Sequence, residues 1–183
     1  MRVKDIILLA ATQVGIVDEV ESYYNGMNGN GEKNADLLLA CFNIVENELA
    51  LDYIPLIAEQ AVTTTTGEIA YSTLSKNVVR IIGVFNEEGE SVPFTLHAAH
   101  MQAQAGKLTV RYTYTPAQKL VGGTSDFSAP VSERLIAYGV AAEYSMAMGL
   151  LSEAAVWDKK YKEGIEAIRR LPTAKRMKER RWV

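Results

Sequence analysis

The two histidines of the chain, His97 and His100, are the first place to look for chemistry, because imidazoles bind metals and move protons. On a helix, this spacing of three would put both rings on one face, where they could hold a metal ion. A catalytic zinc site also needs a third protein ligand and groups that orient the ligands. No cysteine or carboxylate motif stands nearby. We therefore expect a turn at the surface or at an interface, with no metal and no cofactor.

Three glycines, Gly26, Gly29 and Gly31, lie close together early in the chain. They do not follow a predicted strand or begin a βαβ unit, as the glycines of a dinucleotide-binding loop do. The later segment 122–124, Gly-Gly-Thr, lacks the lysine and the spacing of a phosphate-binding loop. No serine stands in a nucleophile-elbow pattern. These patterns do not favour an enzyme.

The remaining carboxylates have structural explanations. Glu87, Glu88 and Glu90 surround a predicted hairpin turn, where solvated charges are usual. Glu133 and Glu143 lie on a mostly apolar predicted helix. An ion pair or an interface contact explains them better than acid–base catalysis does.

The composition is that of an ordinary globular domain. The chain has 183 residues, of which 48% are hydrophobic and 22% are charged, enough for one domain with its own core, or one domain with an arm. Its single cysteine, Cys41, lies in an apolar run, which predicts a small core residue. No continuous apolar stretch reaches the roughly 18 residues of a membrane span. Residues 1–25 are interpreted as an amphipathic helix of the mature chain and not as a signal peptide.

Hydrophobic periodicity predicts an α+β fold, with helices and strands in separate stretches of the chain. We expect a bundle of about four helices with a β-rich insertion between the second and third, followed by an extended C-terminal arm. The expected elements are helices 3–25, 34–51, 131–151 and 153–171, and the β-rich residues 56–115. Residues 1–171 would form one domain, and residues 172–183 would form the arm.

Local signals set the expected helix ends. Asn25 and Gly26 are typical of the C-terminal cap of the first helix. Asn34 and Ser152 are expected as N-caps of the second and fourth helices. Pro130 marks the start of the third helix, which is rich in small residues that let another helix approach closely.

The most regular strand in the sequence is 108–115, which alternates apolar and polar residues. Its alternation predicts one face made of Leu108, Val110, Tyr112 and Tyr114, with threonines and an arginine on the other. The threonine-rich run 63–66 ends at a turn signal, Gly67.

The last twelve residues carry a charge opposite to that of the rest. The chain as a whole has a net charge of −3, and residues 172–183 contain five basic residues and one acidic residue, or +4, so the remainder carries −7. Arginine and tryptophan are frequent at the centres of protein interfaces. Six residues of this arm are therefore the expected docking residues: Lys175, Arg176, Lys178, Arg180, Arg181 and Trp182. The alternative is a nucleic-acid-binding module that uses the same basic segment.

Two stretches carry a resemblance to a known family. They are residues 108–116, Leu-Thr-Val-Arg-Tyr-Thr-Tyr-Thr-Pro, and residues 130–144, continuing to 157–161. With the order of helices, strands, helices and arm, they make the chain resemble the head-to-tail connector adaptor proteins of tailed bacteriophages.

The resemblance implies a structural virion protein and not an enzyme. It implies a ring of identical subunits, typically a dodecamer, between the portal protein and a tail or nozzle protein. Genomic DNA would pass through the channel of the ring without specific binding, and the C-terminal arm would reach the portal. The expected location is the neck of the virion, at the head–tail junction, and the host cytoplasm during assembly, with no membrane partner.

Overall fold

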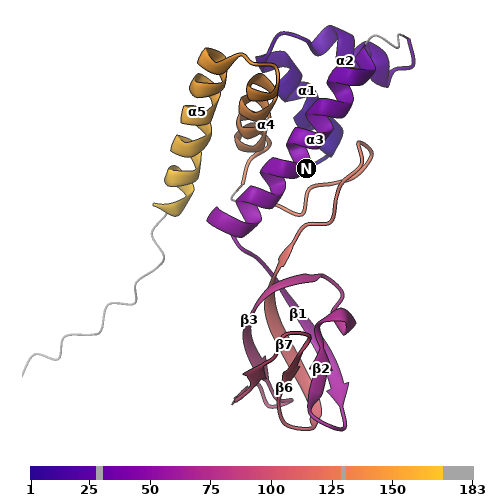
Figure 1. Cartoon of the computed structure of the whole chain (residues 1–183), viewed down its shortest axis with the longest axis vertical. Coiled ribbons are helices and arrows are strands. Elements are labelled where there is room, and N and C mark those ends of the chain that lie inside the picture. Colours follow the sequence, from indigo (N-terminus) through magenta and orange to yellow (C-terminus); the bar gives the residue numbers. More distant parts are fainter. Residues whose placement is uncertain (28–30, 129–130, 171–183) are drawn as a thin grey trace, which may run out of the picture.

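The computed structural model describes residues 1–27, 31–128 and 131–170. It is elongated, with a helical part at one end and a β part, residues 56–115, at the other (Figure 1). Five α-helices and antiparallel sheets make up the described residues. The predicted mixture of α and β structure in separate stretches is therefore confirmed, although the elements differ in detail from those expected.

The helical part contains α1 to α5 (Figure 1). Its bounds are α1 Val3–Gln13, α2 Val17–Tyr24, α3 Glu32–Glu48, α4 Glu133–Ala147 and α5 Leu151–Arg169. A wider π-helical turn, Leu49–Tyr53, extends α3 toward the β part. None of the described helices is both long enough and apolar enough to cross a membrane.

The prediction of one helix over residues 3–25 is wrong, because the chain turns at Gly15. This glycine has φ +78°, a left-handed conformation that favours glycine. Its amide donates to the carbonyl of Thr12, and the amide of Ile16 donates to that of Ala11. This pair of hydrogen bonds is a Schellman cap, which ends α1 and lets α2 start in a new direction.

Gly26 and Gly149 end their helices with the same cap. The cap at Asn25 and Gly26 was predicted and is confirmed. The third predicted helix, 131–151, is too long at its C-terminal end, because α4 ends at Ala147, before Gly149.

Two predicted N-caps are wrong. Asn34 lies inside the first turn of α3, where its amide group hydrogen-bonds to Glu19 and accepts from the Tyr144 hydroxyl. Ser152 lies inside α5, which begins at Leu151. A real cap stands at Ser132, whose hydroxyl accepts from the Leu135 amide at 3.1 Å and starts α4.

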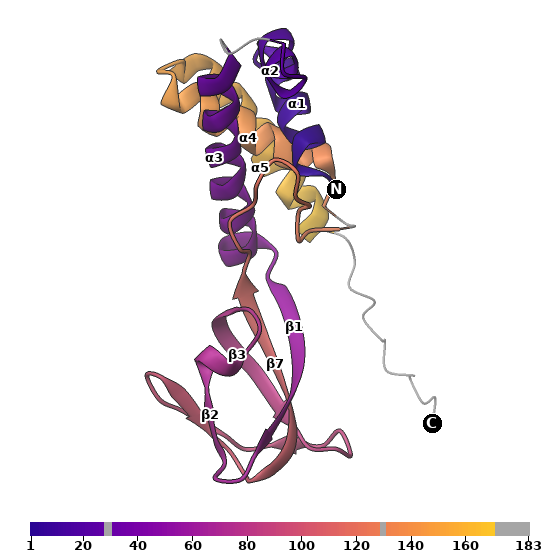
Figure 2. The same ribbon diagram turned by 90° about the vertical axis from the view of Figure 1, so that its right-hand side faces the viewer.

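The β part holds two antiparallel sheets. The larger has the order β1-β7-β3-β4 and the smaller has the order β2-β6-β5. The strands are β1 Leu56–Thr64, β2 Glu68–Ala70, β3 Asn77–Phe85, β4 Ser91–Val92, β5 Thr95–Leu96, β6 His100–Gln102 and β7 Gly106–Thr115. Figure 2 shows β1 and β7 rising side by side from this part toward the helices.

The predicted alternation of the long strand is confirmed in β7. Leu108, Val110 and Tyr112 are buried between the two sheets, whereas Thr109 and Thr113 lie on the outer face. The hydrophobic core of the β part is separate from that of the helical part. The described residues therefore form two cores, and the chain crosses between them twice.

The helix α4 lies at the centre of the helical part, against α1, α3 and α5. Its small residues explain the close packing. A Cβ atom placed on Gly139 would lie 2.7 Å from the Val45 side chain of α3 and 3.0 Å from the Tyr161 ring of α5. Cys41, as predicted, is a buried core residue.

Candidate functional site

The predicted docking arm lies outside the described residues. All six of its expected docking residues, Lys175 to Trp182, fall in the range 171–183. The structure does show where the segment starts. Helix α5 runs back from the far end of the helical part, so its C-terminal end lies nearer the β part (Figure 1).

A group of exposed apolar residues surrounds the turn between α4 and α5. These residues are Met146, Met148, Leu150, Leu151 and Val156, each of them at least 44% exposed. The turn lies at the end of the helical part that is distant from the β part (Figure 1). Apolar side chains gathered on a surface mark contact sites more often than single ones do. We call this set the apolar corner.

The apolar corner was not predicted from the sequence. A helix end rich in Met and Leu is equally consistent with a buried core. Only the packing of α4 and α5 shows that these side chains lie outside the helical core.

A second feature, the junction network, lies in the helical part, where the chain returns from the β part. It consists of Asn43, Glu46, Lys119, Ser125 and Asp126, and it joins α3 to the segment 116–128 that returns from β7. The Asn43 side chain accepts from the Lys119 amide at 2.6 Å and donates to the Lys119 carbonyl at 3.2 Å. The Lys119 ammonium group lies 2.7 Å from the Asp126 carboxylate, and both side chains are largely buried.

Glu46 is the centre of the junction network. Its side chain is 1% exposed, and its Oε1 atom accepts from the Ser125 hydroxyl at 2.6 Å and from the Asp126 amide at 2.9 Å. Burial raises the pKa of Glu46, and the hydrogen bonds and Lys119 oppose that shift only in part. Such a residue holds the return segment firmly against α3, and losing it would leave buried donors without partners.

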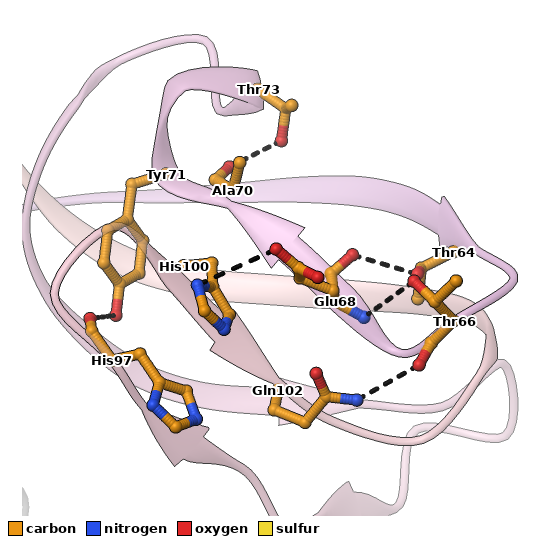
Figure 3. Close-up of polar contacts among 9 residues, drawn as sticks. All are labelled: Thr64, Thr66, Glu68, Ala70, Tyr71, Thr73, His97, His100 and Gln102. Atoms are coloured by element: carbon orange, nitrogen blue, oxygen red, sulfur yellow. Dashed lines mark hydrogen bonds and ion pairs between the residues drawn. The ribbon is translucent and has the colours of Figure 1, made fainter.

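The histidines lie in the smaller sheet, near its β5–β6 turn, and not on a helix (Figure 3). Their rings stack with centroids 4.6 Å apart and planes 22° apart. The Nδ1 atom of His100 is 3.8 Å from the Glu68 carboxylate, and the Tyr71 hydroxyl donates to the His97 carbonyl. Within the described residues no group of three or more His, Cys, Asp or Glu side chains could hold a metal ion. His97 lies in an exposed turn, as predicted, whereas the half-buried His100 is the first residue of β6.

The carboxylates of the sequence analysis are separated by the fold. Glu87 lies in the β3–β4 turn, 3.3 Å from the Lys107 ammonium group. Glu143, on α4, has no ion pair within the described parts of the chain, and the other alternative, an interface contact, stays a prediction. It lies near Glu48 of α3, whose pKa is raised by burial and then by the Glu143 charge.

Comparison with known proteins identifies no relative: no model of a protein family matches the chain, and no curated protein matches it.

Proposed function

We propose that this protein is a structural adaptor of a tailed bacteriophage, with copies arranged in a ring between the portal and the tail. The observation that carries the proposal is the elongated two-part shape. A helical core and a separate β core lie at opposite ends of the molecule, and the chain crosses between them twice. A subunit of this kind can present one end to each of two partners.

The surfaces at the two ends support the same function. The apolar corner lies at the far end of the helical part, and the outer face of the larger sheet lies at the other end. The β part would contact tail components or a neighbouring subunit. The basic residues 172–183 would contact the portal, with Arg and Trp side chains as anchors.

The negative charge of the remainder of the chain suits a channel through which DNA must pass. Residues 1–171 carry a net charge of −7, and like charge limits the binding of phosphates. The layout proposed is the helical bundle with a β-rich insertion and a C-terminal arm, in which 1–171 act as one adaptor domain.

The test is removal of residues 172–183, followed by native mass spectrometry of the protein alone and mixed with portal particles. We expect the shortened chain to keep its circular dichroism spectrum and its unfolding midpoint, because both cores lie in residues 1–170. We expect binding to the portal to be lost. The intact chain should load onto portal in a fixed ratio.

The possible results separate the function from the docking assignment. If the intact protein stays a monomer and does not bind portal, the adaptor function is wrong. If it instead binds DNA with an affinity that falls steeply as salt rises, the basic segment serves a nucleic-acid contact. If the shortened chain binds portal as well as the intact one, the docking residues are misassigned.

A further inference from the structure

A pocket that the proposed function does not use lies where three distant segments of the chain meet. Its volume is about 360 Å³, and it is lined by Arg2, Lys4, Tyr24 and residues 121–123. It therefore combines the start of α1, the end of α2 and a turn in the segment 116–128 that returns from β7. A space of this size is large enough for a small ligand. We call it the basic pocket.

Backbone hydrogen bonds hold two walls of the basic pocket together. The Val3 amide donates to the Gly123 carbonyl at 3.1 Å. Beside this bond, Arg2 and Thr124 form an antiparallel bridge. Figure 2 shows the start of α1 beside the returning segment. The lining residues are therefore placed by backbone contacts between segments far apart in the chain.

The basic pocket differs in charge from the rest of the described chain. Arg2 and Lys4 contribute two cations, and none of the lining residues is acidic. Within the described residues, neither cation forms an ion pair with a carboxylate. Residues 1–171, in contrast, carry a net charge of −7. Two neighbouring cations that no acidic side chain neutralises attract an anion to this place.

The basic pocket also offers uncharged hydrogen-bond donors. The position of Gly122 has open space where a side chain would stand, and its amide donates to no other backbone group among the described residues. The Lys4 ammonium group lies over the Tyr24 ring, 5.4 Å from the ring centroid. Burial, and then the charge of Asp36 on α3, raises the pKa of the Tyr24 hydroxyl to about 12, so the hydroxyl keeps its proton at neutral pH.

We propose that the basic pocket binds a phosphate group, with the Arg2 guanidinium and the Lys4 ammonium group as charged donors and the Gly122 amide as a neutral donor. A guanidinium binds two phosphate oxygens at once, and an ammonium group adds a compact charge. Because glycine has no side chain, a phosphate can approach the backbone of the turn closely. The site does not depend on the proposed ring, since all its lining residues belong to one chain. The phosphate can come from a DNA backbone or from a free phosphate compound, and the test distinguishes these sources.

The test is a titration of the full-length, ¹⁵N-labelled protein followed by nuclear magnetic resonance, at neutral pH and constant ionic strength. One arm adds inorganic phosphate, and the other adds a short DNA duplex. The variant Arg2→Gln/Lys4→Gln removes both cations of the pocket, and Arg2→Gln alone changes only an exposed side chain. The matched control is Lys107→Gln/Lys159→Gln, which removes the same charge at two exposed lysines outside the pocket.

We expect at least one probe to shift the amide signals of residues 2–4 and 122–123 in the wild type, with saturation in the millimolar range for inorganic phosphate. The double pocket variant should bind at least about tenfold more weakly, because it loses hydrogen bonds to two charged groups. Arg2→Gln alone should bind more weakly than the wild type, and the control should match the wild type. Shifts with DNA alone would assign the phosphate to a DNA backbone, and shifts with inorganic phosphate alone would assign it to a free compound.

Three outcomes would overturn the proposal. In the first, neither probe shifts the signals of the basic pocket. In the second, the control weakens binding as much as the double pocket variant does, which would show a general effect of charge. In the third, DNA shifts only residues 172–183 and inorganic phosphate leaves the pocket signals unchanged, so the basic segment is the anion site. None of these outcomes tests binding to the portal, so the adaptor function would stand or fall separately.

Discussion

Truncation of Glu46 is the sharpest test of the junction network. The Glu46→Ala variant removes the acceptor for the Ser125 hydroxyl and for the Asp126 amide, and leaves both donors near α3 without a partner. Two buried hydrogen bonds of about 1–1.5 kcal/mol each give an expected loss of about 2–3 kcal/mol in the free energy of unfolding. The Glu46→Gln variant keeps an acceptor oxygen in place, so we expect it to lie within about 1 kcal/mol of the wild type.

The two variants also differ from the wild type in how stability depends on pH. The pKa of Glu46 is raised in the folded state above its ordinary value of 4.5, so the folded protein holds this proton more tightly than the unfolded chain. The wild type therefore loses stability as the pH rises from about 4.5 through the raised pKa. Glutamine does not titrate, and Glu46→Gln should have a weaker dependence over that range. Glu48, whose pKa is also raised, maintains the remainder of the slope.

The assay is urea unfolding of the wild type and both variants at several pH values from 4.5 to 8. Fluorescence of Trp157, which lies in α5, reports the helical part, and circular dichroism near 218 nm reports the sheets in addition. The reasoning is refuted if Glu46→Ala is no less stable than Glu46→Gln at pH 7. It is also refuted if Glu46→Gln keeps the full pH dependence of the wild type.

Two further substitutions have matched controls. Gly31→Ala should lower the free energy of unfolding by about 1–3 kcal/mol, because the new Cβ would collide with the backbone carbonyl of Glu19. Gly122→Ala is the control: it has open space around it and should stay within about 0.5 kcal/mol of the wild type in the same urea titration. Ser132→Ala should lower the free energy of unfolding by about 1 kcal/mol, because it removes the α4 cap. Ser152→Ala removes no cap hydrogen bond and should lower it by less than half as much, as measured by thermal unfolding. Equal losses at the two serines would contradict the cap assignment.

The helix ends show where reading the sequence succeeds and where it fails. The cap at Gly26 was predicted because an Asn-Gly pair follows an apolar periodic run. Gly15 follows a valine and the apolar spacing continues through it, so the end of α1 was not predicted. Asn34 has the residue type of a cap. Its amide makes contacts to Glu19 and Tyr144 instead, and those residues lie far away in sequence.

The candidate site was predicted only at its basic end, which lies outside the described residues. The apolar corner and the unpaired strand edges of the larger sheet were not predicted. An open strand edge has no sequence signature, because it depends on which strand takes the neighbouring place in the sheet. The role of Glu46 was equally hidden, since its partners are 79 and 80 residues away.

The sequence alone predicted the features that depend on residues close together in the chain. Alternation predicted the faces of β7, apolar spacing predicted a helix over most of α3, and the charge difference between residues 172–183 and the rest is a property of composition. The tertiary structure decided the features that depend on residues meeting across the chain. Those features are the central place of α4, the separation into two cores, the buried Glu46 carboxylate against the segment 116–128 and the order of the strands in the larger sheet. Each depends on which distant segments of the chain pack against each other, and neither periodicity nor composition contains that information.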